Sequence, residues 1–302
     1  MLMKKLSVLI PVHNNLAYTK TCIEKLMAES VEGRFSNMSL SLVVIDDGST
    51  DGTRTWLVNN HSGVTVLDGD GNLWWSGGIN AGARYAIEVQ KADYVLLWNN
   101  DIVADTDYFT ELDRLVPLLG DHIIAGSKIY RKGEDNILWS YGGAFNPRTG
   151  SKYMYGYNKA DGDDFQKPGN ADWLPGMGTL IPAKVIETIG YWDEKNFPQY
   201  HGDSDFTYRA RLAGFGIKVY PGLKIWNDTT NTGLSHQGSL RVLIRLLSDI
   251  KSNYNLKKNI LFYRKYATSI FAYRFLFMAY FMLFGGFFKW KILSALGIRK
   301  PR

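Results

Sequence analysis

The sequence predicts an α/β fold in which a mostly parallel, Rossmann-like sheet is flanked by helices. Two observations carry this expectation. Four short apolar runs alternate with segments of helical periodicity between residues 6 and 97, and three of these runs end in polar loops. Parallel strands need a long crossover, usually a helix, that is right-handed in nearly all proteins, so the alternation predicts consecutive βαβ units.

The individual elements follow from the apolar runs and from the residues that separate them. Strands are expected at 6–12, 41–45 and 64–67, with a fourth that begins at Tyr94. Helices are expected at 16–29, through Trp56 and Leu57, and from about 78 to 90 after a Gly-rich loop. Ser49 is a natural N-cap for the second of these helices.

Polar loops follow three of the strands, at 13–15, 46–48 and 99–101. Because open α/β sheets bind ligands outside the carboxyl ends of their strands, we expect the three loops to converge at that edge. Asp46 is placed to accept a hydrogen bond from a pyrimidine ring N–H. Asp46 and Asp47 are also residue types that cap helices, so one of the two is expected to cap the helix that follows.

The stretch 94–105 is where we expect the chemistry, because an apolar run ends there in the carboxylate of Asp101. Asn99 and Asn100 precede it. Oxygen ligands of this kind suit Mg²⁺ or Mn²⁺, which complete their shell with water and substrate phosphate. The alternative is that this Asn-Asn-Asp segment only starts a turn and caps a helix that begins near Asp107.

Charge is distributed unevenly along the chain. Residues 240–302 hold thirteen Lys and Arg and one acidic residue, a net +12, whereas the preceding 239 residues carry −6. An acidic body that binds a diphosphate needs a cation to screen it, which favours a metal at Asp101. The single cysteine, Cys22, excludes a disulfide framework and a Cys-rich zinc site.

Several nucleotide-binding classes are excluded by missing motifs. The sequence has neither the Gly-x-x-x-x-Gly-Lys-Ser/Thr pattern of a P-loop nor a Gly-x-Gly-x-x-Gly directly after the first strand. The apolar run near the N-terminus is too short for a signal peptide, so a cytoplasmic catalytic part is expected.

Three motifs, in this order and at this spacing, resemble family 2 glycosyltransferases of the GT-A fold: Ile10-Pro-Val-His-Asn14, Val44-Ile-Asp-Asp-Gly-Ser-Thr-Asp51 and Leu97-Trp-Asn-Asn-Asp101. The resemblance implies that the first two loops bind the nucleoside and that Asp101 carries a divalent metal on the diphosphate. The loop 71–82 is similar to the family's Asn-x-Gly segment, above all in its rhamnosyltransferase-like branch, although Ile79 stands where many relatives carry Arg. The residues then expected to bind the nucleotide sugar are Pro11, His13, Asp46, Asp47, Asn80, Asn100 and Asp101.

The resemblance also places the acceptor side and the catalytic base. Residues 173–181 resemble the family's strand that faces the acceptor, and 200–214 resemble its Glu-Asp-x-Asp motif before Arg-x-x-x-Gly. The second acid of that motif is the base in inverting members, so Asp203 is the expected base, with Gly202 in place of the usual Glu. Asp205 is the competing choice, and acids here also favour a helix dipole. The expected acceptor-side residues are Trp173, Gly176 and Asp205, and His236 is the expected further metal ligand.

Residues 131–170 are rich in Gly, Asn, Lys and Asp and predict a loop-and-hairpin insertion. Aromatic residues are dense within it. They either pin the insertion to the body of the protein or stack on a sugar.

The C-terminal part of the chain is basic and aromatic. We expect a helical, membrane-associating domain over 240–302 after a GT-A domain over 1–239. The longest charge-free run, 275–288, has fourteen residues, fewer than the ~20 that span a bilayer. Basic residues flank it, which favours an element lying on an anionic membrane surface. Packing of the aromatics onto the protein or a second copy, and a true membrane span, are the alternatives.

Together these features predict an inverting, metal-dependent glycosyltransferase, peripheral on the inner face of the cell membrane. Its expected partners are a nucleotide-diphosphate sugar, with rhamnose as the suggested sugar, and a lipid-linked saccharide acceptor in bacterial surface polysaccharide synthesis. A sugar nucleotidyltransferase is the first rival, but it would need a Gly-rich basic loop after the first strand. The second rival is a non-catalytic scaffold that binds membrane or nucleic acid through the +12 tail. Nucleic acid is not an expected partner of the enzyme.

Overall fold

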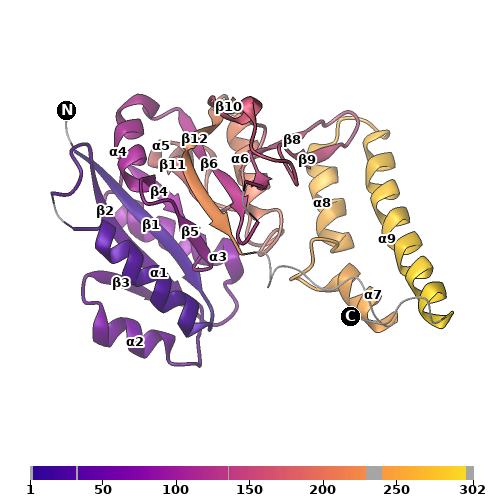
Figure 1. Ribbon diagram of the computed structural model, residues 1–302, viewed down its shortest axis with the longest axis horizontal. Coiled ribbons are helices and arrows are strands. Elements are labelled where there is room, and N and C mark those ends of the chain that lie inside the picture. Colours follow the sequence, from indigo (N-terminus) through magenta and orange to yellow (C-terminus); the bar gives the residue numbers. More distant parts are fainter. Residues whose placement is uncertain (1–2, 32, 135, 229–239, 297–302) are drawn as a thin grey trace. The chain divides into compact units, whose positions relative to one another are not determined.

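The computed structural model describes residues 3–296 apart from 32, 135 and 229–239 (Figure 1). The chain divides into two compact units. The first comprises Met1–Gly143, Met154–Pro198 and Gly202–Thr229, and the second comprises Ala144–Tyr153, Gln199–His201 and Thr230–Arg302. The second unit therefore includes two segments that precede the domain boundary expected at residue 239.

A ten-stranded sheet forms the centre of the first unit. Its strands run in the order β10, β12, β6, β11, β4, β1, β2, β3, with β5 beside β12 and β7 beside β6. Their bounds are β1 (Lys4–Val12), β2 (Met38–Asp46), β3 (Val64–Asp68), β4 (Tyr94–Leu97), β5 (Ile102–Ala104), β6 (Ile123–Arg131), β7 (Leu138–Ser140), β10 (Gly169–Asn170), β11 (Thr179–Pro182) and β12 (Gly216–Asn227). β3, β2, β1 and β4 are parallel neighbours, as predicted, whereas β11 runs antiparallel to β4 and β6.

Helices cover both faces of this sheet (Figure 1). On one face the core includes side chains of α1 (Leu16–Glu29), α2 (Thr53–Asn60) and α4 (Tyr108–Leu119). On the other face it includes side chains of α3 (Trp74–Arg84), α5 (Ala183–Ile189) and α6 (Gly202–Leu212). This layered arrangement confirms the α/β prediction, and the helix expected at 16–29 has the predicted bounds.

Glycines in α3 allow this helix to pack closely on the sheet. A Cβ at Gly82 would lie 2.7 Å from Ile45 Cδ1, and one at Gly78 would lie 3.0 Å from Pro11 Cβ. The helix begins at Trp74, four residues before its expected start, and continues as a π-helix over Tyr85–Val89.

The second helix begins later than its expected cap. α2 starts at Thr53, after Gly52 in a left-handed conformation with a φ of 87°. Ser49 lies in the preceding turn, where its N–H donates to Asp46 Oδ1 and its Oγ accepts from the Asn14 N–H. The prediction that Ser49 caps α2 is therefore wrong.

The described part of the insertion at 131–170 contains short strands and the 3-10 turn Asp163–Phe165, in keeping with the predicted loop and hairpin. The fully buried Lys128 of β6 forms an ion pair with Asp161 at 2.8 Å. This contact ties the insertion to the sheet. Tyr141 is buried and donates its hydroxyl hydrogen to a backbone carbonyl, whereas Tyr153 is exposed.

The second unit contains the helices α7 (Leu240–Ser248), α8 (Leu256–Tyr266) and α9 (Ala272–Ala295). It also contains most of the hairpin of β8 (Gly143–Phe145) and β9 (Lys152–Met154), whose outer residues Gly143 and Met154 belong to the first unit. One face of α9 is buried, and its Tyr280 hydroxyl accepts from Asn259 Nδ2 of α8 at 3.0 Å. The buried residues on this face are Ala272, Leu276, Tyr280, Leu283 and Phe287. The opposite face exposes Phe275, Phe277, Met278, Phe281, Met282, Phe288 and Ile292.

Candidate active site

The three polar loops meet at one edge of the sheet. In the parallel pair β1 and β2, Val12 lies opposite Asp46, and in β1 and β4, Leu9 lies opposite Leu97. The loops that leave these strands therefore begin side by side. This confirms that the expected loops converge at the carboxyl ends of the strands, where ligands bind in open α/β sheets.

The first two loops are tied together by hydrogen bonds. His13 Nδ1 lies 2.6 Å from the carbonyl oxygen of Asp47, so this nitrogen carries the proton. The Thr50 N–H donates to Asn14 Oδ1 at 2.8 Å. Asn14 and Asn15 have left-handed backbones with φ of 59° and 61°, a conformation that Asn tolerates better than most residues. These contacts fix the loop after β1 beside the loop after β2.

Asp46 and Asp47 are both buried but serve different partners. Asp46 Oδ1 accepts from the Ser49 N–H at 2.9 Å. The Asp47 carboxylate accepts from three N–H groups at the start of α3, those of Gly71 at 2.8 Å, Leu73 at 3.2 Å and Trp74 at 3.0 Å. Asp47 thus caps α3 and not α2, the helix that follows it in sequence. Because Asp47 uses both oxygens on the chain, Asp46 is the better candidate for the nucleoside.

Asp101 lies between β4 and β5 with an unsatisfied oxygen. Its Oδ1 is buried and has no hydrogen-bond partner among the described residues. Burial raises the pKa of this carboxyl; its backbone N–H opposes that rise, Asp228 adds to it and Lys132 opposes it. A buried carboxylate oxygen without a donor is costly, and a cation at this point would remove the cost.

Strand pairing brings a second carboxylate to the same place. β5 runs antiparallel to β12, with Asn227 opposite Ile102. Asp228 follows Asn227 and Asp101 precedes Ile102, so the two carboxylates lie at the same end of this strand pair. Lys132 Nζ lies 2.9 Å from Asp228 Oδ2. Sequence reasoning missed Asp228, because the pairing of the short β5 with the distant β12 is not visible in the sequence.

These two carboxylates fit the expected metal. Mg²⁺ and Mn²⁺ are usually held by one or two carboxylates, with water and substrate phosphate as the remaining ligands. Among the described residues there is no group of three or more His, Cys, Asp or Glu that could form a closed metal cage. His236, the expected further ligand, lies outside the described residues.

Asp203 stands in the first turn of α6 and is oriented by backbone donors. Its Oδ2 accepts from the Gly176 N–H at 3.1 Å, and its Oδ1 accepts from the Ser204 N–H at 2.7 Å. These two donors orient the carboxylate of a residue that is partly exposed. Gly176 precedes β11, which runs antiparallel to β4. The predicted base therefore lies near the edge where β4 ends.

Asp205, the competing base, is 0% exposed. Its Oδ2 accepts from Arg209 Nε one helical turn further on, at 3.0 Å. Arg209 also donates to the carbonyl oxygens of Ile189 and Tyr191. Asp205 thus anchors α6 to the segment after α5, which favours Asp203 as the base and argues against Asp205 as an acceptor contact.

Asn80 has a structural position that the sequence did not indicate. It is buried in α3, and its amide donates to Trp192 O at 3.0 Å and to Glu194 Oε2 at 2.6 Å. Its Oδ1 accepts from the Trp192 N–H at 2.9 Å. With both ends of the amide engaged, Asn80 holds α3 to the segment 192–194, and a direct contact with the nucleotide sugar is not supported.

Two other predicted site residues contact protein groups. The buried Trp173 ring covers Gly143, where a Cβ would lie 2.1 Å from a ring carbon, so its surroundings are those of a core residue and not of an acceptor contact. Asn100 Nδ2 donates to Thr19 Oγ1 at 3.0 Å. This bond links the Asp101 loop to α1.

Trp75 was not among the expected site residues, yet it lies between them. Its indole Nε1–H donates to Asn99 Oδ1 at 3.2 Å. Its ring lies over Gly176, where a Cβ would be 2.2 Å from Cζ2. The pair of Trp residues inside the Gly-rich loop 71–82 is the sequence signal that could have indicated it.

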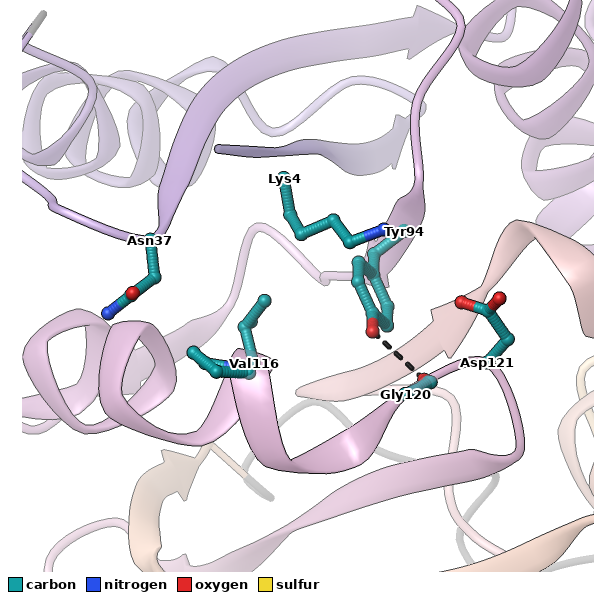
Figure 2. Close-up of a pocket in the computed structure, with 7 residues that line it drawn as sticks. Lys4, Asn37, Tyr94, Val116, Gly120 and Asp121 are labelled. Atoms are coloured by element: carbon teal, nitrogen blue, oxygen red, sulfur yellow. Dashed lines mark hydrogen bonds between the residues drawn. The ribbon is translucent and has the colours of Figure 1, made fainter. Parts of the chain in front are cut away.

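A hollow of about 240 Å³ opens at the other end of the sheet (Figure 2). It is lined by Lys4, Asn37, Tyr94, Val116, Pro117, Gly120 and Asp121. The Tyr94 hydroxyl donates to the Gly120 carbonyl at 2.9 Å (Figure 2). Lys4 and Tyr94 are the first residues of β1 and β4, so this hollow lies at the amino ends of the strands, away from the candidate site.

Residues 7–174 match the family described as Glycosyl transferase family 2. The chain belongs to this family. The match covers more than half of the chain and includes all three motifs that suggested the resemblance.

Two relatives of the chain carry the names of sugar transferases. The low-salt glycan biosynthesis hexosyltransferase Agl10 of Haloferax volcanii is 26% identical over 199 residues, which cover 63% of this chain and 60% of the relative. An uncharacterized glycosyltransferase of Rickettsia felis is 27% identical over 199 residues, which cover 62% of this chain and 28% of the relative. The chain thus spans less than two thirds of either relative.

The fold of the chain is similar to that of GalNAc-T7 in a crystal structure with UDP, GalNAc and Mn²⁺. The TM-score is 0.58 at 13% sequence identity, and the likeness covers 92% of this chain and 57% of that one. At this identity the likeness shows the fold alone. It confirms the GT-A architecture expected from the motifs.

Proposed function

We propose that this glycosyltransferase moves a sugar from a nucleoside-diphosphate sugar to a saccharide hydroxyl, with inversion and with a divalent metal. The observation that carries the proposal is the position of Asp101 and Asp203 near one edge of the sheet. Asp101 has a buried oxygen without a partner among the described residues, and Asp203 is a partly exposed residue whose carboxylate is oriented by backbone donors. Asp101 suits the side of the leaving diphosphate in a displacement reaction, and Asp203 suits the side of the attacking hydroxyl.

The donor would lie along the loops after β1, β2 and β4. Asp46 and His13 are proposed to contact the nucleoside, while Asp101 and Asp228 would hold Mg²⁺ or Mn²⁺ beside the diphosphate. When bound, the ion neutralises the charge that develops on the departing diphosphate. The structure of GalNAc-T7, which has a similar fold, holds Mn²⁺ together with UDP and GalNAc, and this is consistent with the use of a divalent metal.

Asp203 is proposed to act as the general base. It accepts the proton of the acceptor hydroxyl as that oxygen bonds to the anomeric carbon. The bond to the diphosphate breaks on the opposite face of the same carbon, so the configuration inverts. The Gly176 N–H holds the carboxylate in place during this transfer, because its hydrogen bond fixes the orientation of Oδ2.

For the substrates we propose a rhamnosyl donor and a lipid-linked saccharide acceptor, in synthesis of a bacterial surface polysaccharide at the cytoplasmic face of the membrane. The loop 71–82, similar to that of rhamnosyltransferase-like members, supports the donor. The glycan-biosynthesis role in the name of the Haloferax relative supports a glycan product. The exposed apolar face of α9 supports an acceptor presented at a membrane.

Membrane association is proposed to be peripheral. Among the described residues one helix, over Ala272–Ser294, is long and apolar enough to cross a membrane. Its charge-free part, 275–288, measures about 21 Å at 1.5 Å per residue, which is short of the ~30 Å hydrocarbon core. The buried face of α9 packs within its own unit, and the exposed face is free to meet lipid.

A binding screen tests the donor and metal parts of this proposal. Nucleoside-diphosphate sugars are added with Mn²⁺ or with EDTA, and the unfolding midpoint is measured for wild type, Asp101→Asn and Asp107→Asn. Asp107 is an exposed carboxylate near the same loop and serves as the matched control. A ligand at ~100 times its dissociation constant adds about 2.7 kcal/mol to the free energy of unfolding.

We expect stabilisation that needs both metal and sugar nucleotide and is lost only in Asp101→Asn. Equal stabilisation in EDTA would count against a metal at Asp101. Formation of a sugar nucleotide from a nucleoside triphosphate and a sugar phosphate would favour the nucleotidyltransferase rival. Salt-sensitive DNA binding without any response to sugar nucleotides would favour the scaffold.

A further inference from the structure

Trp75 joins the Asp101 loop to α3. Its Nε1–H donates to Asn99 Oδ1 at 3.2 Å, and Asn99 is two residues before Asp101. Indole has one donor, so this single bond defines the rotation of the ring relative to the loop. The Trp75 side chain thus links α3 directly to the loop after β4.

The same indole ring also lies against the residues that orient the proposed base. A Cβ at Gly176 would be 2.2 Å from Trp75 Cζ2 and 2.5 Å from Cη2. The Gly176 N–H donates to Asp203 Oδ2 at 3.1 Å. The ring therefore sets how closely the 176 backbone, and the carboxylate bonded to it, approach α3.

Gly202, which replaces the Glu of the family motif, borders the same space. A Cβ at this position would lie 2.1 Å from Ser76 Oγ and 3.4 Å from Trp75 Cζ3. Ser76 Oγ occupies the volume that a side chain at 202 would need, and the Trp75 ring is in van der Waals contact with the same space. The residue after Trp75 therefore accounts for the glycine at this position of the motif.

The backbone around Trp75 is held on both sides. Trp74 has a left-handed φ of 57°, which bulky residues rarely adopt and which persists only where neighbouring contacts enforce it. Ser76 donates its N–H to Pro198 O at 2.8 Å and its hydroxyl hydrogen to Phe197 O at 2.6 Å. The backbone that carries the Trp75 ring is therefore held in place from both sides.

From these contacts we propose that Trp75 is a positioning residue that fixes the distance between the metal-binding loop and the catalytic base. The inference rests on the proposed function, because it assumes that Asp101 and Asp203 act on one donor–acceptor pair. Trp75 acts through Asn99 on one side and through Gly176 on the other. Its loss lowers kcat more than it raises the KM for either substrate, since it misplaces reacting groups without removing a binding contact.

A double-mutant cycle of Trp75→Phe and Asn99→Leu tests the first contact. Phe keeps a ring against Gly176 but lacks the N–H. Loss of one hydrogen bond lowers kcat about tenfold, so each single variant and the double variant all show roughly this loss. Trp56→Phe in α2, combined with Asn99→Leu, is the matched control and behaves additively. Additive, roughly hundredfold loss in the Trp75 cycle overturns the proposal.

The second contact is tested by Gly176→Ala with and without Trp75→Leu. In wild type the added methyl meets the ring, and turnover falls. In the Trp75→Leu background the space is open, so the same substitution has little further effect. If Gly176→Ala is equally harmful in both backgrounds, the ring does not set the position of residue 176.

Two further readouts separate the outcomes. If the Trp75 and Asn99 substitutions are coupled in the unfolding midpoint while kcat stays at the wild-type value, the bond has a structural role only. That result overturns the proposal. If Trp75→Phe does not fold, Asn99→Asp, which keeps the acceptor oxygen, retains more activity than Asn99→Leu. Asp203→Asn is measured alongside: retained turnover in that variant contradicts the proposed function, whereas the Trp75 cycles are judged from their own coupling.

Discussion

Asp203 Oδ2 accepts a hydrogen bond from the Gly176 N–H at 3.1 Å. This bond joins a carboxylate of α6 to the backbone before β11, two segments that the sequence resemblance assigned separately to the base and to the acceptor side. A carboxylate held by a backbone donor keeps its orientation when a substrate binds. This hydrogen bond therefore favours Asp203 over Asp205 as the catalytic base, and substitution of each carboxylate tests that assignment.

We predict that Asp203→Asn lowers turnover by orders of magnitude while the donor dissociation constant changes little. The amide keeps the size of the side chain but cannot take up the acceptor proton. Steady-state rates and donor titrations measure the two quantities separately. Turnover close to wild type would remove Asp203 from the mechanism.

Asp205→Asn serves as the matched comparison and should act on stability instead. The substitution leaves the Arg209 guanidinium beside a neutral amide in a buried site, and breaking a buried pair typically costs about 3–5 kcal/mol. The unfolding midpoint should fall, with less effect on turnover in the molecules that remain folded. The reverse pattern, with Asp205→Asn inactive and Asp203→Asn active, would exchange the roles of the two carboxylates.

Asp228 gives a second prediction, for metal affinity. If Asp228 shares an ion with Asp101, Asp228→Asn should weaken Mn²⁺ binding in the presence of UDP. Loss of a residue that only orients a metal ligand typically weakens binding roughly 10- to 100-fold, and loss of a ligand itself should weaken it by more. Titration followed by the Mn²⁺ spin-resonance signal measures this without any turnover. Asp107→Asn should leave the affinity unchanged. If Asp228→Asn binds Mn²⁺ as tightly as wild type does, Asp228 is not a ligand and Asp101 remains the metal candidate.

Much of the fold could be predicted because its signals are local. The apolar runs and helical periodicities of β1, α1 and β2 lie within single segments, and each was placed within a few residues of its position. Convergence of the polar loops then follows from parallel pairing alone. The metal candidate Asp101 was chosen for the same reason, since it lies in the polar loop that follows a strand.

The remaining site residues depend on contacts between distant segments. Asp47 caps α3 across the neighbouring βα unit, and Asn80 is engaged by residues 192–194. Asp228 depends on the pairing of β12 with β5. No periodicity or motif reports such contacts, so the sequence indicates residue types with the right chemistry and not which of them face a ligand.

His201 gives a prediction about pH and stability in the second unit. The partly buried ring lies with Nδ1 3.0 Å from Lys152 Nζ and Nε2 2.9 Å from Asn259 Oδ1. Burial and the Lys152 charge hold the pKa of His201 well below 6.5, against an opposing effect of Asn259. Below about pH 6.5 the unfolded chain therefore binds a proton that the folded chain does not.

The free energy of unfolding should consequently fall as the pH is lowered from about 6.5, by at most about 1.4 kcal/mol per pH unit from this group. His201→Asn should show a smaller decrease of the unfolding midpoint between pH 7 and 5. Asn suits the left-handed φ of 70° at this position. Lys152→Met, which removes the neighbouring cation, should also give a shallower decrease. An unchanged pH dependence in both variants would show that His201 does not titrate in this way.

The last prediction concerns the exposed face of α9. Phe277 and Phe281 lie one turn apart and are 66% and 62% exposed, with ring centroids 6.3 Å apart. Replacing both with Ser should leave the unfolding midpoint near that of wild type, because neither side chain is packed inside the protein. Transfer of a Phe side chain out of water is worth about 1.5–3 kcal/mol, so the double variant should bind anionic vesicles at least tenfold more weakly.

Leu118 of α4, which is 77% exposed in the first unit, supplies the control, and Leu118→Ser should sediment with vesicles as wild type does. Lys289→Ser with Lys291→Ser should weaken binding at low salt and have less effect at high salt, because charge near the surface contributes roughly 1 kcal/mol per basic residue and salt screens it. Unchanged sedimentation of the Phe277 and Phe281 variant would place the membrane contact elsewhere. Protein that stays with the vesicles through high salt and alkaline extraction would show that α9 spans the bilayer, with Arg274 drawn to one interface.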